Sequence, residues 1–145
     1  MDCYLSLMKG HQSDVNCLSS CNNLLASGSE DSTIRIWDIT SQKSVRRLTD
    51  PSFYPSHPIE NISLHETSIF ASTSSSIYEF DIRNPSAILL SSSLSQLQLP
   101  FDLSSLNQST NHILVSTDDG EILLLDKSSK ETKFKSAPHT NVTHT

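Results

Sequence analysis

The sequence predicts an all-β fold made of repeated four-stranded antiparallel units. Short runs in which apolar and polar residues alternate recur along the 145 residues, and tight polar turns separate them. The third run of each unit ends on an aspartate, and these aspartates, Asp38, Asp81 and Asp126, are 43 and 45 residues apart. A period of about 40–45 residues with four short strands per repeat is the pattern of β-propeller blades.

The first unit, about residues 10–48, has the clearest pattern. Its expected strands are residues 14–18, 24–29, 33–38 and 44–48. Glu30-Asp31 makes a tight acidic turn between the second and third of these runs, which predicts a β-hairpin. The four runs together predict one antiparallel sheet.

Two further units follow, the second at about residues 57–91 and the third at about residues 98–135. The expected strands of the second unit are residues 59–64, 68–73, 77–81 and 87–90. Those of the third unit are residues 100–106, 113–117, 122–126 and 132–135. Residues 139–145 have the pattern that would begin a fourth unit.

The chain, residues 1–145, is therefore expected to be a single incomplete propeller domain, an open arc of about three blades. A propeller closes with about four to eight blades, and each blade needs neighbours to bury both faces of its sheet. Residues 4–8 are expected to form the outer strand of a blade whose other strands lie elsewhere. We expect the chain to be part of a longer protein, or to need missing blades or a second chain to close the ring.

The first unit resembles a WD repeat. Gly10-His11, the run from Leu24 to Asp31, and Trp37-Asp38 are similar to the WD40-repeat consensus in residue type and order. The later units carry Phe80 and Leu125 where the first carries Trp37. The resemblance implies a non-catalytic protein-protein interaction scaffold, in which loops and turns carry the specificity.

His11, Ser27 and Asp31 are also the residue types of a serine hydrolase triad. The WD resemblance implies a structural network instead, in which the turn Asp bonds the His, the His meets the Ser, and the Ser reaches the indole N–H of Trp37. Ser27 lies within an alternating strand pattern and not on an exposed nucleophile turn. The sequence therefore favours the structural network over catalysis.

Phe80-Asp81-Ile82-Arg83 is the second candidate site. In an extended segment Asp81 and Arg83 project to the same side, and an Arg presents a planar set of donors that suits carboxylates. The segment resembles the Trp-Asp-x-Arg box of cullin-4 ubiquitin ligase substrate receptors, which implies contact with the damage-specific DNA-binding protein adaptor. Phe80 replaces the Trp, and neither Trp37–Thr40 nor Leu125–Ser128 provides a second box. The alternative is an ordinary solvated Arg83 beside Asp81, on a scaffold for another complex in chromatin, RNA processing or trafficking.

Composition argues against several other classes of function. The chain has 10 basic and 16 acidic residues and a net charge of −6, so it offers no basic face for nucleic acid. The three cysteines and the pair His139 and His144 fit no zinc pattern, and the three glycines form no phosphate-binding loop. We therefore expect no cofactor and no metal.

The sequence also predicts where the protein resides. The apolar runs are too short to span a bilayer, and residues 1–5 do not begin a secretory signal. Free thiols favour a reducing compartment. We expect an intracellular protein, in the cytoplasm or the nucleus, without membrane contact.

Overall fold

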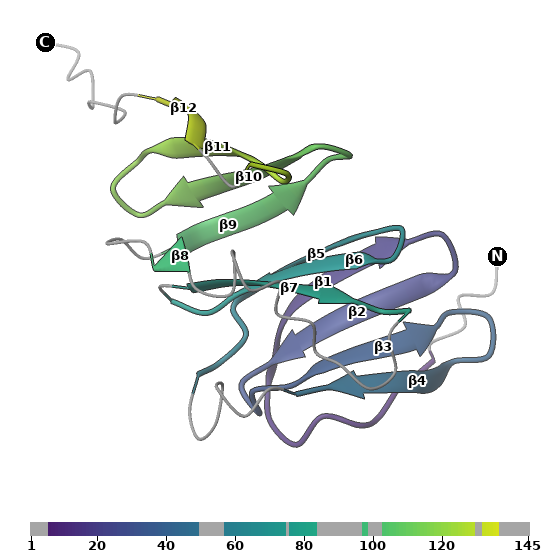
Figure 1. Cartoon of the computed structure of the whole chain (residues 1–145). Coiled ribbons are helices and arrows are strands. Elements are labelled where there is room, and N and C mark those ends of the chain that lie inside the picture. The colour runs from purple at the N-terminus through teal and green to yellow at the C-terminus, as the bar shows by residue number, and fades with distance from the viewer. Residues whose placement is uncertain are drawn as a thin grey trace, which may run out of the picture.

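The computed structural model describes residues 6–49, 57–74, 76–83, 97–98, 103–129 and 132–136, which form three antiparallel sheets (Figure 1). The first sheet has the strand order β1 (Val15–Cys21), β2 (Leu24–Ser29), β3 (Ile34–Asp38) and β4 (Lys43–Leu48). The second has the order β5 (Asn61–His65), β6 (Ser68–Ser72), β7 (Ser76–Asp81) and β8 (Leu97–Gln98). The third contains β9 (Leu103–Gln108), β10 (His112–Thr117), β11 (Ile122–Asp126) and β12 (Thr132–Lys135), again paired in sequence order.

The three sheets repeat one local hydrogen bond. In each sheet, the residue after the third strand donates its N–H to a carbonyl in the turn between the first two strands, over 2.9 Å. The pairs are Ile39 with Asn23, Ile82 with Thr67, and Lys127 with Asn111. Because the same turn chemistry recurs with the sequence period, the sheets are copies of one blade, and the prediction of an all-β arc of blades is confirmed.

The sheets stack face to face through two apolar cores. In Figure 1 they follow one another from the purple and blue first sheet, through the second sheet with its teal strands β5, β6 and β7, to the green and yellow third sheet. The core between the first and second sheets contains Ala26, Ile34, Ile36, Leu48, Ile59, Ile62, Leu64, Ile69, Ala71, Tyr78 and Phe80. The core between the second and third sheets contains Phe70, Ile77, Leu106, Ile113, Val115, Leu123 and Leu125.

Strand β6 shows why the second sheet is apolar on both faces. Successive side chains of a strand point to opposite faces, so Ile69 and Ala71 enter the first core while Phe70 enters the second. All three side chains are fully buried. A sheet covered on both faces is expected to have such an unbroken apolar run in place of strict alternation.

The outer two sheets each leave one face uncovered by another described sheet, so the arc does not close on itself. The exposed aliphatic side chains include Val15 and Leu18 on β1, and Leu114 and Ile122 on the third sheet. Within the described ranges, no helix has the length and apolar character needed to cross a bilayer.

Some strand boundaries differ from those that the sequence predicts. The fourth strand of the second sheet is β8, whereas the expected strand 87–90 lies outside the described residues. Strand β9 is described from Leu103, and the earlier residues of the expected strand, 100–102, lie outside the described residues. Residues 6–8 form no strand, because they pair with none of the described strands. Residues 4–5 and the expected fourth unit at 139–145 lie outside the described residues.

Candidate interaction sites

A buried polar network lies on the first sheet. Strand β2 supplies Ser27, strand β3 supplies Trp37, the turn between them supplies Asp31, and His11 comes from the segment before β1. The indole N–H of Trp37 donates to Ser27 Oγ over 2.8 Å, and Ser27 Oγ lies 2.7 Å from His11 Nε2. His11 Nδ1 lies 3.0 Å from Asp31 Oδ2. The structure thus brings together all four residues that the sequence proposes for the network.

The side chains of the network are nearly all buried. The side chains of His11 and Asp31 are 5% and 9% exposed, and Ser27 is 2% exposed. Hydrogen bonds in such a setting are electrostatically stronger than in water, and an unpaired polar group there is costly. The four side chains therefore fasten β2, β3, their turn and the segment before β1 to one another.

Thr33 is a member of this network that the sequence does not single out. Its N–H donates to Asp31 Oδ1 over 3.0 Å, and its Oγ1 lies 3.2 Å from His11 Nδ1. A hydroxyl residue two positions after a turn aspartate is a familiar local hydrogen-bonding pattern, and this spacing is the signal that could have identified it. Thr33 holds the Asp31 carboxylate in the position that His11 requires.

The Asp31 carboxylate stays ionised far below neutral pH. Burial acts to raise its pKa, but hydrogen bonds from Thr33, from the Gln12 N–H and from His11 outweigh burial. The result is a pKa of about 2 for Asp31. An acceptor of this kind is charged throughout the physiological range.

Replacing Asp31 with asparagine is expected to lower the free energy of unfolding at pH 7 by about 2 kcal/mol, since each pKa unit is about 1.4 kcal/mol. The folded-state pKa of about 2 lies below the unfolded value. The contribution of Asp31 is therefore complete above about pH 4 and is lost as the pH falls toward about 2. Urea unfolding of wild type and variant between pH 7 and pH 3 measures the difference, which should shrink on acidification. The exposed turn variant Asp119→Asn is the control, and a pH-independent difference for Asp31→Asn would contradict the expectation.

The distances among Ser27, His11 and Asp31 would also suit a catalytic triad, so the surroundings of Ser27 decide between the two interpretations. Ser27 lies in the middle of β2, which pairs with β1 on one side and β3 on the other. Backbone N–H groups in such a strand serve the two ladders and are poorly placed to form an oxyanion hole. Ser27 Oγ also accepts from the Trp37 indole, which lowers its nucleophilicity. These features favour the structural interpretation.

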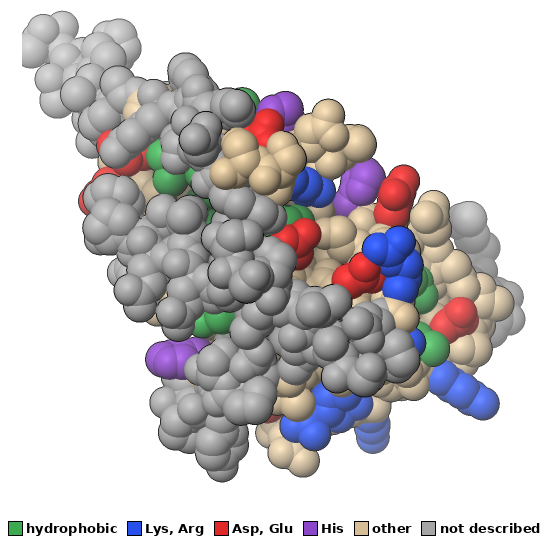
Figure 2. Space-filling model, in the orientation of Figure 1, with side chains coloured by type: hydrophobic (Ala, Val, Ile, Leu, Met, Phe, Trp, Pro, Cys, Tyr) green, Lys and Arg blue, Asp and Glu red, His purple; other side chains and the backbone are tan. Residues whose placement is uncertain are grey.

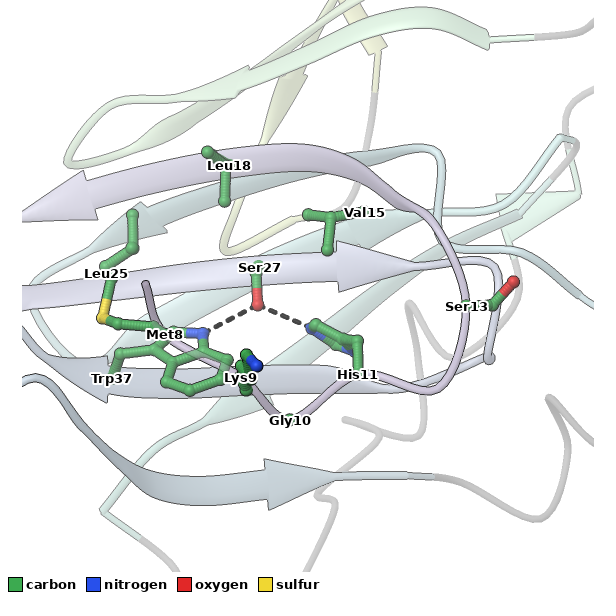
Figure 3. A pocket seen from close by; sticks show the side chains of 10 residues that line it. All are labelled: Met8, Lys9, Gly10, His11, Ser13, Val15, Leu18, Leu25, Ser27 and Trp37. Atoms are coloured by element: carbon green, nitrogen blue, oxygen red, sulfur yellow. Dashed lines mark hydrogen bonds between the residues drawn. The ribbon is translucent and has the colours of Figure 1, made fainter. Parts of the chain in front are cut away.

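A pocket of about 410 Å³ lies over this network (Figure 3). Leu25 and Ser27 of β2 line the pocket, whereas Ala26 between them packs in the core against the second sheet. Because successive side chains of a strand point to opposite faces, the pocket lies on the face of the first sheet that no other described sheet covers. Figure 3 shows the segment from Met8 to His11 running past the indole of Trp37. The backbone of this segment lies close to the indole, because a Cβ at Gly10 would lie only 2.9 Å from Trp37 Cη2.

The second candidate site lies where β7 ends. Phe80 is 1% exposed and packs in the first core, so it supports the site from inside and does not reach the surface as an adaptor contact would require. Asp81 and Arg83 emerge beyond it, with side chains 30% and 71% exposed. Figure 2 shows basic, acidic and His side chains gathered along the edge where the β1–β2 and β5–β6 turns lie in Figure 1.

Asp81 holds Arg83 in a bidentate ion pair. Arg83 Nε donates to both carboxylate oxygens over 2.9 and 3.0 Å, and Nη2 donates to Oδ2. The Arg83 N–H also donates to Asp81 Oδ1 over 2.9 Å. The Arg83 hydrogen bonds lower the pKa of Asp81, and Asp81 raises the pKa of Arg83. The guanidinium is therefore fixed in direction while much of it remains open to solvent.

Next to this ion pair, a small apolar crevice lies between the first and second sheets. It has a volume of about 150 Å³ and is lined by Leu24, Ile36, Val45, Arg46 and Ile82. The Arg46 guanidinium donates to the Ile82 carbonyl and joins the two sheets at this point. Sequence reasoning missed the crevice because its walls come from residues far apart in the chain.

The structure shows two free cysteines and no metal-binding cluster in the part of the chain that it describes. Cys17 and Cys21 are free thiols, and burial is the main cause that raises the pKa of Cys17 to about 11. Among the described residues, no three His, Cys, Asp or Glu side chains lie together in a way that could hold a metal ion.

Stacked four-stranded sheets define the chain as a partial β-propeller, and the His–Ser–Trp–Asp network in the first sheet is the one that the resemblance to WD repeats implies. A family model for the WD domain, G-beta repeat, matches residues 2–38, the region that contains most of the first sheet. Over 142 residues the chain is 28% identical to the WD repeat-containing protein 53 homolog of Dictyostelium discoideum, covering 92% of this chain and 37% of that protein. The short motifs at residues 24–28, 81–83 and 106–108 also resemble WD repeat-containing protein 53, and the similarity to WD repeats and to this protein is confirmed for the chain as a whole.

Other similarities are shorter or rest on the fold alone. Over 44 residues the chain is 48% identical to the probable E3 ubiquitin ligase complex SCF subunit scon-2 of Neurospora crassa, covering 30% of this chain and 7% of that protein. Among solved structures, the computationally designed Ika4 protein has a TM-score of 0.70 at 19% identity, covering 96% of this chain and 82% of that one. The Cps50 (Swd1) β-propeller domain of Myceliophteria thermophila has a TM-score of 0.70 at 17% identity, covering 89% and 43%. The chain thus spans about a third or less of the curated relatives named here.

Proposed function

We propose that this WD-repeat chain is a non-catalytic scaffold that acts as a substrate receptor of a cullin-4 type ubiquitin ligase, with Arg83 as its contact to the adaptor. The observation that carries the proposal is the Asp81–Arg83 ion pair at the end of β7. An exposed Arg that is already oriented loses less side-chain entropy when it binds a carboxylate or carbonyl of a partner.

The geometry of Arg83 suits this role. Nε and Nη2 face Asp81, and the side chain is 71% exposed, so the donors on Nη1 are left to point toward a partner. A guanidinium offers planar hydrogen bonding that a lysine ammonium does not. The site lies on turns at the sheet edges, where propellers carry binding residues on a rigid scaffold.

The comparisons support the scaffold class more strongly than the ligase role. The relative from Neurospora crassa is named as a ubiquitin ligase subunit, but the match extends over 44 residues, about the length of one blade. Similarity over a single blade identifies the type of repeat, but it does not determine which partner the protein binds. The proposal of a ligase receptor in the cytoplasm or nucleus therefore depends on Arg83 and its test.

Arg83→Ala is expected to reduce capture of the damage-specific DNA-binding protein adaptor at least tenfold, because an oriented Arg is a frequent energetic centre of protein interfaces. The measurement is co-precipitation of the adaptor with the full chain, followed by quantitative binding of purified partners. Arg83→Lys keeps the charge but loses the planar fork and should also bind weakly. Lys9→Ala, which removes an exposed basic side chain in the segment before β1, should bind like wild type.

Equal capture by wild type and Arg83→Ala, or capture by neither, would remove the ligase role. A scaffold in another assembly would then be the remaining function, since the same blades would serve it. Capture that is lost with both Arg83 variants and kept with Lys9→Ala would support the receptor function.

A further inference from the structure

The crevice between β4 and the end of β7 has the size of a socket for one side chain. Its volume of about 150 Å³ is below the roughly 300–1,000 Å³ of pockets that hold small-molecule ligands. Leu24, Ile36, Val45 and Ile82 give it aliphatic walls. A single Leu, Ile or Val side chain is what such a space accepts.

A bulge in β4 opens this socket. The pairing of β3 with β4 shifts register between Ile36 and Trp37, which pair with Arg46 and Ser44. Val45 is therefore the extra residue on β4, and a bulge of this kind redirects a side chain. The consequence is visible in its exposure, since Val45 is 58% exposed although it lines an apolar crevice.

The rim of the crevice is basic in a chain whose net charge is −6. Arg46 lines the crevice, Lys43 is exposed on the same edge strand, and Arg83 directly follows the wall residue Ile82. These side chains would attract carboxylates and repel basic segments.

The neighbouring acidic side chains are occupied locally. Asp38 Oδ1 accepts from the Ser41 N–H over 2.6 Å, and its Oδ2 accepts from Asn23 over 2.8 Å. Asp81 is bound to Arg83. These bonds orient the two carboxylates but leave their charge, so three basic side chains, Lys43, Arg46 and Arg83, face two acidic ones, and the excess at the crevice is a small positive charge.

We infer that the crevice binds an acidic protein segment through one aliphatic anchor residue, with flanking carboxylates against Arg83 and the basic residues of β4. The inference rests on the proposed function in that it specifies the chemistry of the segment that Arg83 recognises. A buried anchor side chain in an apolar pocket, with charged residues around the rim, is a common arrangement at protein-protein interfaces.

The first experiment selects random 12-residue peptides by display on the full chain. We expect enriched peptides to contain one Leu, Ile or Val with Asp or Glu within a few positions. The strongest peptide is then synthesised, and its affinity is measured by fluorescence anisotropy. Val45→Glu should weaken binding at least tenfold by placing a carboxylate in the socket, and Arg83→Ala should weaken it several-fold.

The matched control is Val15→Glu, the same substitution at a valine that is 49% exposed on β1. It should leave the affinity within twofold of wild type. Equal binding by wild type and Val45→Glu would overturn the inference, as would selection of basic peptides or of none. Selection of aliphatic peptides without acidic residues would also overturn the inference. Residues 87–90 of this chain have that composition, so this result would indicate that a segment of the chain itself occupies the crevice.

Adaptor capture separates this inference from the proposed function. Loss of capture with both Arg83→Ala and Val45→Glu supports both. Loss with Arg83→Ala alone overturns the inference and leaves the proposed function standing. If wild type captures no adaptor, the proposed function fails, and the peptide selection alone decides whether the crevice binds acidic aliphatic segments.

Discussion

Replacing Gly28 with alanine is expected to lower the free energy of unfolding by about 1–3 kcal/mol or more, the usual range for overpacking a close-packed core. Gly28 lies on β2 and faces the second sheet. A Cβ at this position would lie 2.5 Å from Ile59 Cγ2 and 2.6 Å from Cys17 Sγ. Ile59 is fully buried, and its N–H donates to the Ser29 carbonyl over 3.1 Å, so it cannot retreat without disturbing the contact between the sheets.

A double-mutant cycle with Ile59 tests this cause. Ile59→Ala alone should cost about 2–5 kcal/mol through the cavity that it leaves. Because that cavity removes the contact with Ile59 Cγ2 but leaves Cys17 Sγ at 2.6 Å, Gly28→Ala should cost less in the Ile59→Ala background than in wild type without becoming neutral. Equilibrium urea unfolding of the four proteins gives the coupling free energy. Additive costs would show that the clash with Ile59 is not what destabilises the alanine variant.

The sequence predicts the strands well where neighbouring residues decide them. In the first sheet, alternation and the Glu30-Asp31 turn are local signals, and β2 occupies the predicted residues 24–29. The fourth strand of the second sheet is different. Its pairing of Ile77 with Leu97 joins residues far apart in the chain, so the short alternation at residues 96–99 does not by itself show that this run pairs with β7.

The candidate sites show the same division. The His11 network could be proposed because each member lies at a fixed place in one repeat. The burial of Phe80 depends on packing against the first sheet, which the motif at 80–83 does not reveal. The contact between Arg46 and the Ile82 carbonyl also joins two repeats, and only the structure places these residues together.

Ser27→Ala is expected to lower the free energy of unfolding by about 3 kcal/mol, because it leaves two buried groups without their partner at about 1–3 kcal/mol each. These groups are the Trp37 indole N–H, 2.8 Å from Ser27 Oγ, and His11 Nε2, 2.7 Å from it. His11→Ala should also destabilise, since it removes the buried imidazole that links Ser27 to Asp31 and leaves these two side chains only their bonds to Trp37, Thr33 and Gln12. Thermal and urea unfolding measure both effects. Ser20→Ala, at an exposed position of β1, is the control and should change stability by less than about 0.5 kcal/mol.

The same variants separate a structural network from a catalytic one. A serine held by an indole donor within a doubly paired strand should not react with a fluorophosphonate probe, and the wild-type chain should show no hydrolase turnover. Loss of stability without any labelling of Ser27 is the outcome that a structural network requires. Covalent labelling of Ser27 in the folded chain, abolished by His11→Ala, would instead show that His11 activates Ser27 as a nucleophile, since that chemistry needs the base and not merely the fold.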